Sequence, residues 1–312
     1  MHKNLKRIST IDLTREQWLD HRRKSIGGSD AASIIGLNPY AGAYTVWADK
    51  TGRLLETEGN EAMRQGRDLE SYVASRWSEA TGKKVRSVNA ILANLEYPFA
   101  HANVDRLVVG ESAGLECKTT SSLNLKKFKG GEYPESYYVQ CVHYMAVTGA
   151  ERWYLAVLVL GREFYTFTIE RDEDEINALM AQEQEFWRCV TSDIPPMVDG
   201  APATTEALET IYAESNGGEI ELFGREKLLT EYHEQKAVKA TIEARMEEIK
   251  QLLMSDLGEN EAGNCGTFRV TWKPQTRNTF NAKSFTADHP AMDLSGYYNS
   301  TTFRKFEIKE IG

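Results

Sequence analysis

The first two thirds of the chain alternate between the helical period of 3.6 residues and the strand period of two. The clearest helix is predicted from Asn60 to Glu79, because Leu69, Val73 and Trp77 recur at intervals of four. A capping-box pattern that begins at Thr14 marks the start of another helix. By the same criteria, the helical segments expected in this part of the chain are 14–23, 31–36, 44–50, 60–79, 134–148 and 172–190.

Strands are predicted where β-branched and aromatic residues gather between turn signals. The segment from Trp153 to Leu160 is almost entirely apolar, which is typical of a central strand that is buried on both faces. Gly161 and Arg162 then turn the chain into a hairpin partner. Other strands are expected at 85–92, within 97–109 with a break near 101–103, and at 115–119. These elements predict an α/β fold with a central mixed sheet of about five strands that is flanked by helices.

The last third of the chain has a different pattern. A stretch rich in Pro, Thr and Gly at 200–218 suggests a connection, and a long charged helix follows at 226–257. Apolar residues on this helix step by four, three and four, as in a packing seam: Ile242, Met246, Ile249 and Leu253. Two short strands are expected at 268–272 and 302–308. We therefore predict one domain over 1–200 and a C-terminal helical and β extension over 201–312, which serves oligomerisation or DNA contact.

Composition is that of a globular protein, and no apolar run approaches the roughly 20 residues that span a bilayer. The first ten residues, MHKNLKRIST, lack the apolar segment of a secretory signal. The four cysteines show no paired metal-ligand spacing: Cys117, Cys141, Cys189 and Cys265. A reduced, cytoplasmic protein is therefore expected.

The net charge of −9 gives no support for a nucleic-acid partner, but the distribution of charge along the chain does not exclude DNA binding. Basic clusters lie at 22–24, 83–86 and 126–129, while much of the acidic excess falls in later helices such as 170–185. Bound cations would also reverse the sign of the charge at an acidic site.

The segment from Val104 to Thr120 carries the strongest candidate chemistry. It reads as a strand, a turn and a second strand, on which Glu116 and Lys118 share one face while Leu115 and Cys117 point to the other. Asp105 on the neighbouring strand can bring a second carboxylate near them. Two acids and a lysine at strand ends can hold divalent cations and direct a water at a phosphodiester.

Two further segments hold candidates that the pattern alone leaves open. Glu70 lies beside the buried face of its helix, where a carboxylate is uncommon unless it is paired or coordinating; the alternative is an edge residue that reaches water. The loop from Ser25 to Asp30 places two glycines before a helix. This arrangement suits a phosphate-binding site, or simply a capped helix after a turn.

His143 is expected to be a packed histidine. Tyr137 and Tyr138 are expected to be core or groove aromatics, with stacking on a terminal base as the alternative.

These residues together resemble a known family. Asp105 followed by Glu116-Cys117-Lys118 is similar to the core motif of the PD-(D/E)XK nucleases, although Val104 stands where that motif often has a proline. Three further motifs occur in the order expected of one branch: RRKSIGGSDA, GRDLESYV with Glu70, and YYVQCVHYM with Gln140. Over roughly residues 18–196 the chain thus resembles the YqaJ-type viral recombinase and phage lambda exonuclease family.

The resemblance implies a restriction-endonuclease-like core and a role for each matching residue. Asp105 and Glu116 would bind one Mg²⁺ with the backbone carbonyl of Cys117, and Asp105 and Glu70 would hold a second ion, with Mn²⁺ as a substitute metal. Lys118 would position or deprotonate the attacking water, and a last residue, Gln140, would hold the geometry. A separate pair, Arg22 and Ser29, would grip a 5′-terminal phosphate.

The implied reaction is Mg²⁺-dependent hydrolysis of one strand of linear duplex DNA from its 5′ end, leaving 3′ single-stranded overhangs for recombination by strand annealing. The implied partners are DNA ends, a single-strand annealing protein and further copies of the chain in a trimeric ring. The resemblance also implies a phage or prophage protein that works in the bacterial cytoplasm.

Three alternatives remain at this stage. They are a PD-(D/E)XK endonuclease, a non-catalytic DNA-binding recombination scaffold, and a metabolic α/β protein on which these charges are unrelated. The last requires charges without partners in a strand-like segment, which is costly. An iron–sulfur nuclease is disfavoured because the four cysteines are not clustered.

Overall fold

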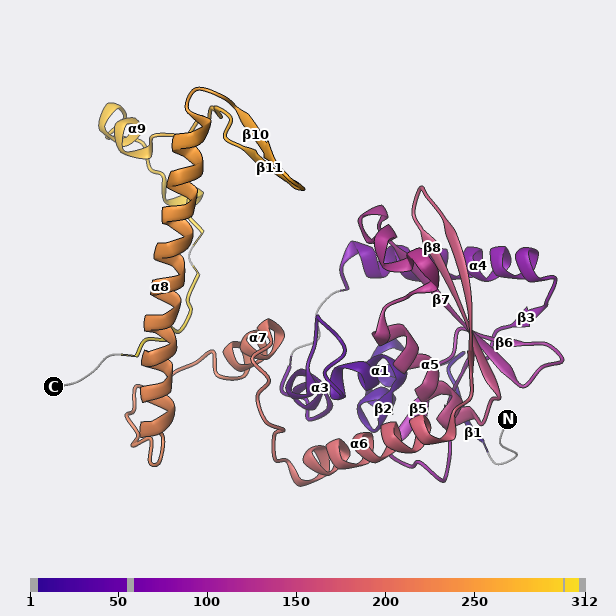
Figure 1. The fold of residues 1–312 in the computed structure, drawn as a ribbon. Helices are drawn as coiled ribbons and strands as arrows, with labels where there is room; N and C mark the ends of the chain where they lie inside the picture. The colour runs from indigo at the N-terminus through magenta and orange to yellow at the C-terminus, as the bar shows by residue number, and fades with distance from the viewer. Residues whose placement is uncertain (1–4, 55–58, 300, 309–312) are drawn as a thin grey trace. The chain divides into compact units, whose positions relative to one another are not determined.

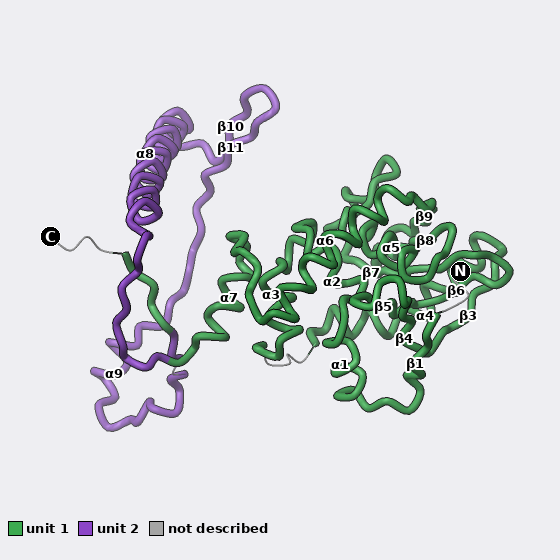
Figure 2. Tube along the Cα trace, turned by 90° about the horizontal axis from the view of Figure 1, so that it is seen from below, with its two compact units in different colours: residues 1–214, 304–312 green, residues 215–303 purple. Residues whose placement is uncertain are grey.

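The computed structural model describes residues 5–54, 59–299 and 301–308 (Figure 1). Contacts within the chain divide it into two compact units, one of residues 1–214 with 304–312 and one of residues 215–303 (Figure 2). The first unit holds the α/β core, and each unit is described by itself.

A five-stranded sheet forms the centre of the first unit. Its order is β3 (Val85–Arg86), β6 (Arg106–Val108), β7 (Ala113–Thr120), β8 (Arg152–Val159) and β9 (Phe164–Glu170). All neighbours pair antiparallel except β7 and β8, which are parallel because the chain between them crosses over through the 3₁₀ segment η1 (Ser122–Gly131) and helix α5 (Glu135–Thr148). The predicted mixed sheet of about five strands is confirmed.

Helices cover the two faces of this sheet, with α4 (Glu61–Thr81) on one side and α5 on the other. Residues of β8 alternate between them: Trp153 and Leu155 join the core cluster under α5, whereas Tyr154 and Ala156 join the cluster under α4. Because both faces are covered, the strand can be apolar at nearly every position, as its sequence predicted.

The remaining helices of the core lie within three residues of the predicted segments. They are α1 (Arg15–Arg23), α2 (Gly28–Ile34), α3 (Ala43–Lys50) and α6 (Glu173–Ser192). Helix α2 begins at Gly28 rather than at residue 31, so that Ser29 and Asp30 lie in the helix and not in the loop before it. The capping box at Thr14 is formed, because its hydroxyl accepts from the backbone N–H of Gln17 and the side chain of Gln17 accepts from the backbone of Thr14.

A second sheet of four strands was not predicted. It consists of β1 (Lys6–Ser9), β4 (Ala90–Ala93), β5 (Ala100–Ala102) and β2 (Ile26–Gly27) in that order. The single strand predicted at 85–92 is wrong, because the chain breaks at Asn89, whose φ is +47°. The two halves, β3 and β4, pair in different sheets.

The predicted connection at 200–218 contains a helix, α7 (Pro202–Ile211), which is a second correction. Proline at its first position and the Asp199 carboxylate, which accepts from the N–H of Ala201 and the hydroxyl of Thr204, start the helix. Ala207 is buried and belongs to the main core cluster. The boundary between the two units therefore falls after Glu214 rather than at residue 200.

The second unit is built on the helix α8 (Glu226–Leu257), whose predicted bounds are confirmed. A hairpin of β10 (Ala262–Cys265) and β11 (Phe268–Thr271) follows, then α9 (Ala282–Asp288) and the 3₁₀ turn η2 (Ser295–Tyr297). The strand predicted at 302–308 is wrong, since the described residues 301–308 join no sheet. Within the described ranges, no helix has the length and apolar character that crossing a membrane requires.

Candidate active site

Strand β7 presents the two predicted charges on one face. Glu116 and Lys118 point toward α5, while Leu115 and Cys117 pack on the α4 side, as the period of two predicted. The Lys118 ammonium lies 2.7 Å from the Glu116 carboxylate, which is 3% exposed. A buried ion pair at this position is costly unless further hydrogen bonds complete it.

Gln140 on α5 completes that pair. Its amide nitrogen donates to Glu116 Oε1 at 2.8 Å, and its amide oxygen accepts from Lys118 Nζ at 2.8 Å. The same nitrogen donates to the hydroxyl of Tyr144, one helical turn further on, which in turn donates to the backbone oxygen of Asn103 at 2.9 Å. From α5, Gln140 therefore holds both charged side chains of β7, Glu116 and Lys118, in place.

Asp105 lies immediately before β6 and next to the same cluster. Its Oδ2 accepts a 2.7 Å hydrogen bond from the backbone N–H of Cys117. Burial raises the pKa of Asp105 well above its ordinary value, and the carboxylates of Glu116 and Glu70 raise it further. The site thus concentrates negative charge in a partly desolvated place.

Glu70 approaches from α4 but is engaged elsewhere. It forms an ion pair with Arg106, whose guanidinium also donates to the hydroxyl of Ser71 at 3.2 Å and to the backbone oxygen of Asp105 at 2.6 Å. The structure therefore brings Asp105, Glu116, Lys118 and Gln140 together. Glu70 lies beside this cluster but pairs with Arg106.

Sequence reasoning missed two members of this arrangement, Arg106 and Tyr144. Arg106 directly follows Asp105, and Tyr144 follows Gln140 by one helical turn. These spacings were the available signals, but neither residue type identifies its partner without the fold.

The oxygen donors of Asp105 and Glu116 suit the magnesium that the resemblance implies. Carboxylate oxygens are the ligands that Mg²⁺ prefers, and Glu116 Oε2 is buried without a hydrogen-bond partner. The like charges that raise the pKa of Asp105 would be neutralised by a cation. Over the described ranges, no three His, Cys, Asp or Glu side chains already gather as a metal cluster, since Glu70 pairs with Arg106. Asp105 and Glu116 fit the ion; Glu70 would have to leave Arg106 to join them.

Lys118 is held as an ammonium by its neighbours. Burial lowers its pKa, but the Glu116 carboxylate outweighs this and leaves the pKa above its ordinary value. The ammonium also lies 5.2 Å from the ring centroid of Tyr137 on α5. A cation in this place suits holding negative charge on a phosphate.

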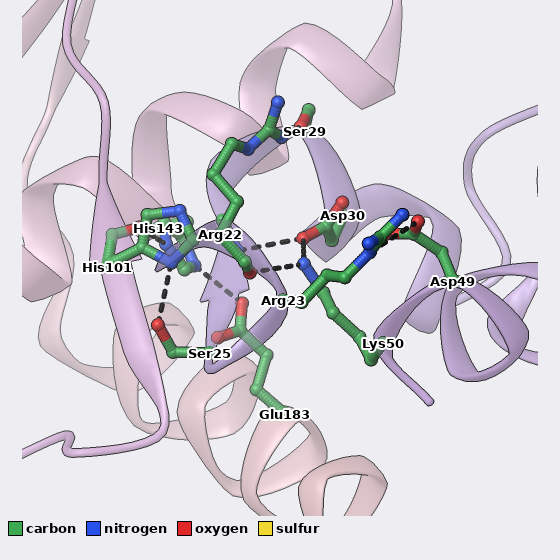
Figure 3. Close-up of polar contacts among 11 residues, drawn as sticks. Arg22, Arg23, Ser25, Ser29, Asp30, Asp49, Lys50, His101, His143 and Glu183 are labelled. Carbon is green, nitrogen blue, oxygen red and sulfur yellow. Dashed lines mark hydrogen bonds and ion pairs between the residues drawn. The ribbon is translucent and has the colours of Figure 1, made fainter. Parts of the chain in front are cut away.

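The predicted phosphate pair meets at the junction of α1 and α2 (Figure 3). Arg22 Nη2 donates to the Ser29 hydroxyl at 2.9 Å, and the guanidinium stacks at 4.8 Å from the ring centroid of Trp18. Its Nε is buried without a hydrogen-bond partner. The fork of Arg22 is therefore oriented, beside an exposed hydroxyl, as anion binding requires.

A buried ion pair supports this junction (Figure 3). Lys50 Nζ lies 2.6 Å from Asp30 and also donates to the backbone oxygen of Arg22 at 2.9 Å. Burial alone would raise the pKa of Asp30, but the cations of Lys50 and Arg22 lower it to about 2. Asp30 also accepts the backbone N–H of Gly27, so this N–H of the glycine loop is already taken.

A chain of buried hydrogen bonds continues from this loop into the core (Figure 3). Ser25 Oγ lies 2.8 Å from His101 Nδ1, the backbone oxygen of His101 lies 2.8 Å from His143 Nε2, and His143 Nδ1 lies 2.8 Å from Glu183. His143 is fully buried, so its predicted packed role is confirmed. Tyr138 is likewise structural, because it bonds Glu175 and packs near Tyr133.

A cleft of about 760 Å³ opens beside the phosphate pair. Residues of α1, α3, α4 and α7 line it, among them the cations Arg15, Arg22, Arg23, Lys50 and Arg67 against the acids Asp49 and Glu206. We call it the basic cleft. Its excess of cations provides the local positive charge that the net charge of −9 conceals.

Comparison with known proteins places this chain in a family. The family model of the YqaJ-like viral recombinase domain matches residues 17–151, a range that contains every candidate site residue. Over 307 residues the chain is 39% identical to the Uncharacterized protein YqaJ of Bacillus subtilis (strain 168), with 96% of each chain covered. The chain belongs to the YqaJ-like viral recombinase family.

The fold of this YqaJ-like chain is shared with a solved nuclease structure. An alkaline exonuclease from Laribacter hongkongensis aligns with a TM-score of 0.50 and 21% identity, covering 57% of this chain and 94% of that chain. The structure of that enzyme in complex with dAMP aligns with the same values. This likeness establishes a restriction-endonuclease-like fold, as the resemblance implied.

Proposed function

We propose that this YqaJ-like protein is a metal-dependent deoxyribonuclease of phage-type recombination. The observation that carries the proposal is the buried cluster of Glu116, Lys118 and Gln140, with Asp105 2.7 Å from the backbone of Cys117. Family membership supports it, as does the shared fold with an enzyme described as an alkaline exonuclease.

Asp105 and Glu116, with the carbonyl of Cys117, would hold one Mg²⁺, and Asp105 and Glu70 a second, with Mn²⁺ as a substitute. When bound, the ions would acidify an attacking water and neutralise charge that develops on the phosphate and the leaving oxygen. Lys118 would bind a phosphate oxygen through its ammonium. Gln140 would keep the Lys118 and Glu116 side chains in register by the two hydrogen bonds that it makes with them.

We propose further that the enzyme degrades one strand of linear duplex DNA from a 5′ end and leaves a 3′ overhang. The support is the Arg22–Ser29 pair beside the basic cleft, in which an oriented guanidinium can donate two hydrogen bonds to a terminal phosphate. A 3′ overhang is the substrate of a single-strand annealing protein, which we propose as the partner. The proposed assembly is a trimeric ring around the duplex.

The test uses linear duplex DNA labelled at the 5′ or the 3′ end, with Mg²⁺ or with EDTA. Mg²⁺-dependent loss of the strand from its 5′ end is expected, with the opposite strand left intact. Glu116→Gln and Lys118→Met should each lower the rate about 10²- to 10³-fold while the protein stays folded and binds DNA. Cleavage of covalently closed circles would instead indicate an endonuclease, and full activity in both variants would refute the site.

A further inference from the structure

An exposed tyrosine lies where the basic cleft meets a second hollow. Tyr40 lines the basic cleft and also a smaller pocket of about 130 Å³, which we call the terminal pocket. Its side chain is exposed, with 78% of the residue accessible. An exposed aromatic ring beside a basic cleft can stack on a nucleobase.

The terminal pocket leads to the catalytic cluster. It is lined by Thr120, the last residue of the strand that carries Glu116 and Lys118, and by Tyr137. The Tyr137 ring lies 5.2 Å from the Lys118 ammonium. Tyr40 therefore lines one hollow that contains Arg22 of the phosphate pair and a second hollow whose Tyr137 lies near Lys118.

The loop that carries Tyr40 is anchored at its base. The Asn38 side chain accepts from the backbone N–H of Tyr40 at 3.0 Å and donates to the Ser33 hydroxyl at 2.9 Å. The N–H of Leu37 donates to the backbone oxygen of Ala32 at 2.8 Å, which ties the loop to the end of α2. An aromatic ring presented from a fixed backbone loses little entropy when it binds a flat ligand.

A strand that passes from the phosphate pair to Lys118 carries a base at every nucleotide. Two arginines of the basic cleft could bind phosphates of such a strand: Arg22, and Arg67, which lies on α4 three residues before Glu70. Among the aromatic residues that line the two hollows, Tyr40 is exposed, whereas Trp18 and Tyr137 are half-buried and Phe128 is buried. Stacking on an aromatic ring is independent of base identity, which suits an enzyme that must act on any sequence.

We propose that Tyr40 stacks on a base of the strand being degraded and so positions the terminal nucleotide between the phosphate pair and Lys118. This inference rests on the proposed function and adds a positioning residue to it. The ligand is a nucleobase of any identity at a DNA end.

The experiment compares wild type, Tyr40→Ala, Tyr40→Phe and the matched control Tyr72→Ala. Tyr72 is an exposed tyrosine of α4 that lines neither hollow. DNA ends carry 2-aminopurine at one of the first three 5′ nucleotides, and binding is measured with Ca²⁺ in place of Mg²⁺. Wild type and Tyr40→Phe should quench the fluorophore at one position, whereas Tyr40→Ala should lose that quench and bind the end about 5- to 100-fold more weakly.

A second substrate separates the effect of base stacking on Tyr40 from any effect that the substitution has on the surrounding loop. It is the same duplex with an abasic site at the quenched position. Wild type and Tyr40→Ala should degrade it at equal rates with Mg²⁺, because no base remains to stack, while Tyr72→Ala should match wild type on both substrates. An equal defect of Tyr40→Ala on normal and abasic ends, or an unchanged quench, would overturn the stacking role. A wild type that does not degrade linear duplex at all would instead overturn the proposed function.

Discussion

Gly28 lies against the ring of Tyr144, so closely that a β-carbon at position 28 would stand 2.6 Å from Cε1 of the tyrosine. Gly28 begins α2 and precedes Ser29 of the phosphate pair, while Tyr144 bonds the Gln140 side chain. This close approach joins the element of the phosphate pair directly to the helix that fixes the catalytic cluster. The distance between the two proposed subsites is therefore set by packing and not by a loop.

Gly28→Ala should damage both stability and activity. The added methyl group must displace the Tyr144 ring, and overpacking of this kind costs about 1–3 kcal/mol. The displaced ring would also disturb Gln140, so the rate of strand degradation should fall. Thermal melting and the degradation assay measure the two effects.

Gly66→Ala is the matched control for that substitution. Gly66 lies within α4, and the nearest atom to a β-carbon there is the Thr119 hydroxyl at 3.7 Å, an ordinary contact. Alanine in place of glycine inside a helix should raise stability by up to about 1 kcal/mol. If Gly28→Ala melts at or above wild type, the tight packing inferred for Tyr144 is wrong.

Asp105→Asn should stabilise the protein without metal and abolish its activity. Burial and the carboxylates of Glu116 and Glu70 raise the pKa of Asp105, so stability falls as the pH rises through that value and the aspartate ionises. A neutral asparagine removes the repulsion and can still accept the N–H of Cys117. The melting temperature at neutral pH should therefore increase, and the further increase that Mg²⁺ gives wild type should disappear.

Asp68→Asn controls for the loss of a charge in general. Asp68 is an exposed residue of α4 that pairs loosely with Arg64, at 3.8 Å, so its replacement should change stability by less than about 0.5 kcal/mol. If Asp105→Asn instead lowers the melting temperature, repulsion among the carboxylates of Asp105, Glu116 and Glu70 does not destabilise the folded protein.

Much of the catalytic cluster could be predicted because it depends on local periodicity. The period of two on β7 places the side chains of Glu116 and Lys118 on one face of the strand and that of Cys117 on the other, whatever the rest of the fold does. The engagement of Glu70 with Arg106 could not be predicted, since these residues lie 36 positions apart and meet only when α4 packs on β6 and β7.

The errors in the fold share one cause, the dependence of strands and short helices on tertiary context. The stretch 85–92 has the composition of one strand, but the positive φ of Asn89 divides it between two sheets. Helix α7 was missed because its ten residues, PATTEALETI, lie in a stretch rich in Pro, Thr and Gly that is typical of a connection, and so short a helix becomes stable by burying Ala207 against the core. Local pattern cannot reveal either outcome.

His101 should make the protein sensitive to mild acid. Burial, with the nearby Lys50 and Arg22 cations, lowers the pKa of His101 from 6.5 to about 3. In the unfolded chain it takes up a proton near pH 6.5, so stability should be complete above that pH and be lost progressively as the pH falls toward 3, by at most about 5 kcal/mol. Unfolding in urea at pH 7, 6, 5 and 4 measures this slope.

His101→Gln should flatten that dependence, because glutamine can bond Ser25 but does not titrate. His289→Gln, at an exposed position, should leave the slope of wild type unchanged. An equal loss of stability in wild type and His101→Gln between pH 6.5 and 4 would assign the acid sensitivity to other groups.

The apolar row on α8 should drive self-association. Ile242, Met246, Ile249 and Leu253 are between 39% and 64% exposed, and the last three border a groove of about 590 Å³ that the β10–β11 hairpin closes with Val270 and Trp272. Four large apolar side chains at intervals of four, three and four on one helix have the spacing of a helix–helix seam.

The double variant Ile242→Lys, Ile249→Lys should therefore convert the oligomer expected of wild type to monomer. The double variant Glu243→Lys, Glu247→Lys makes a larger change of charge on the same helix and should keep the mass of wild type. Light scattering coupled to gel filtration distinguishes these outcomes, and a wild type that runs as a monomer at micromolar concentration would show that the seam serves something else.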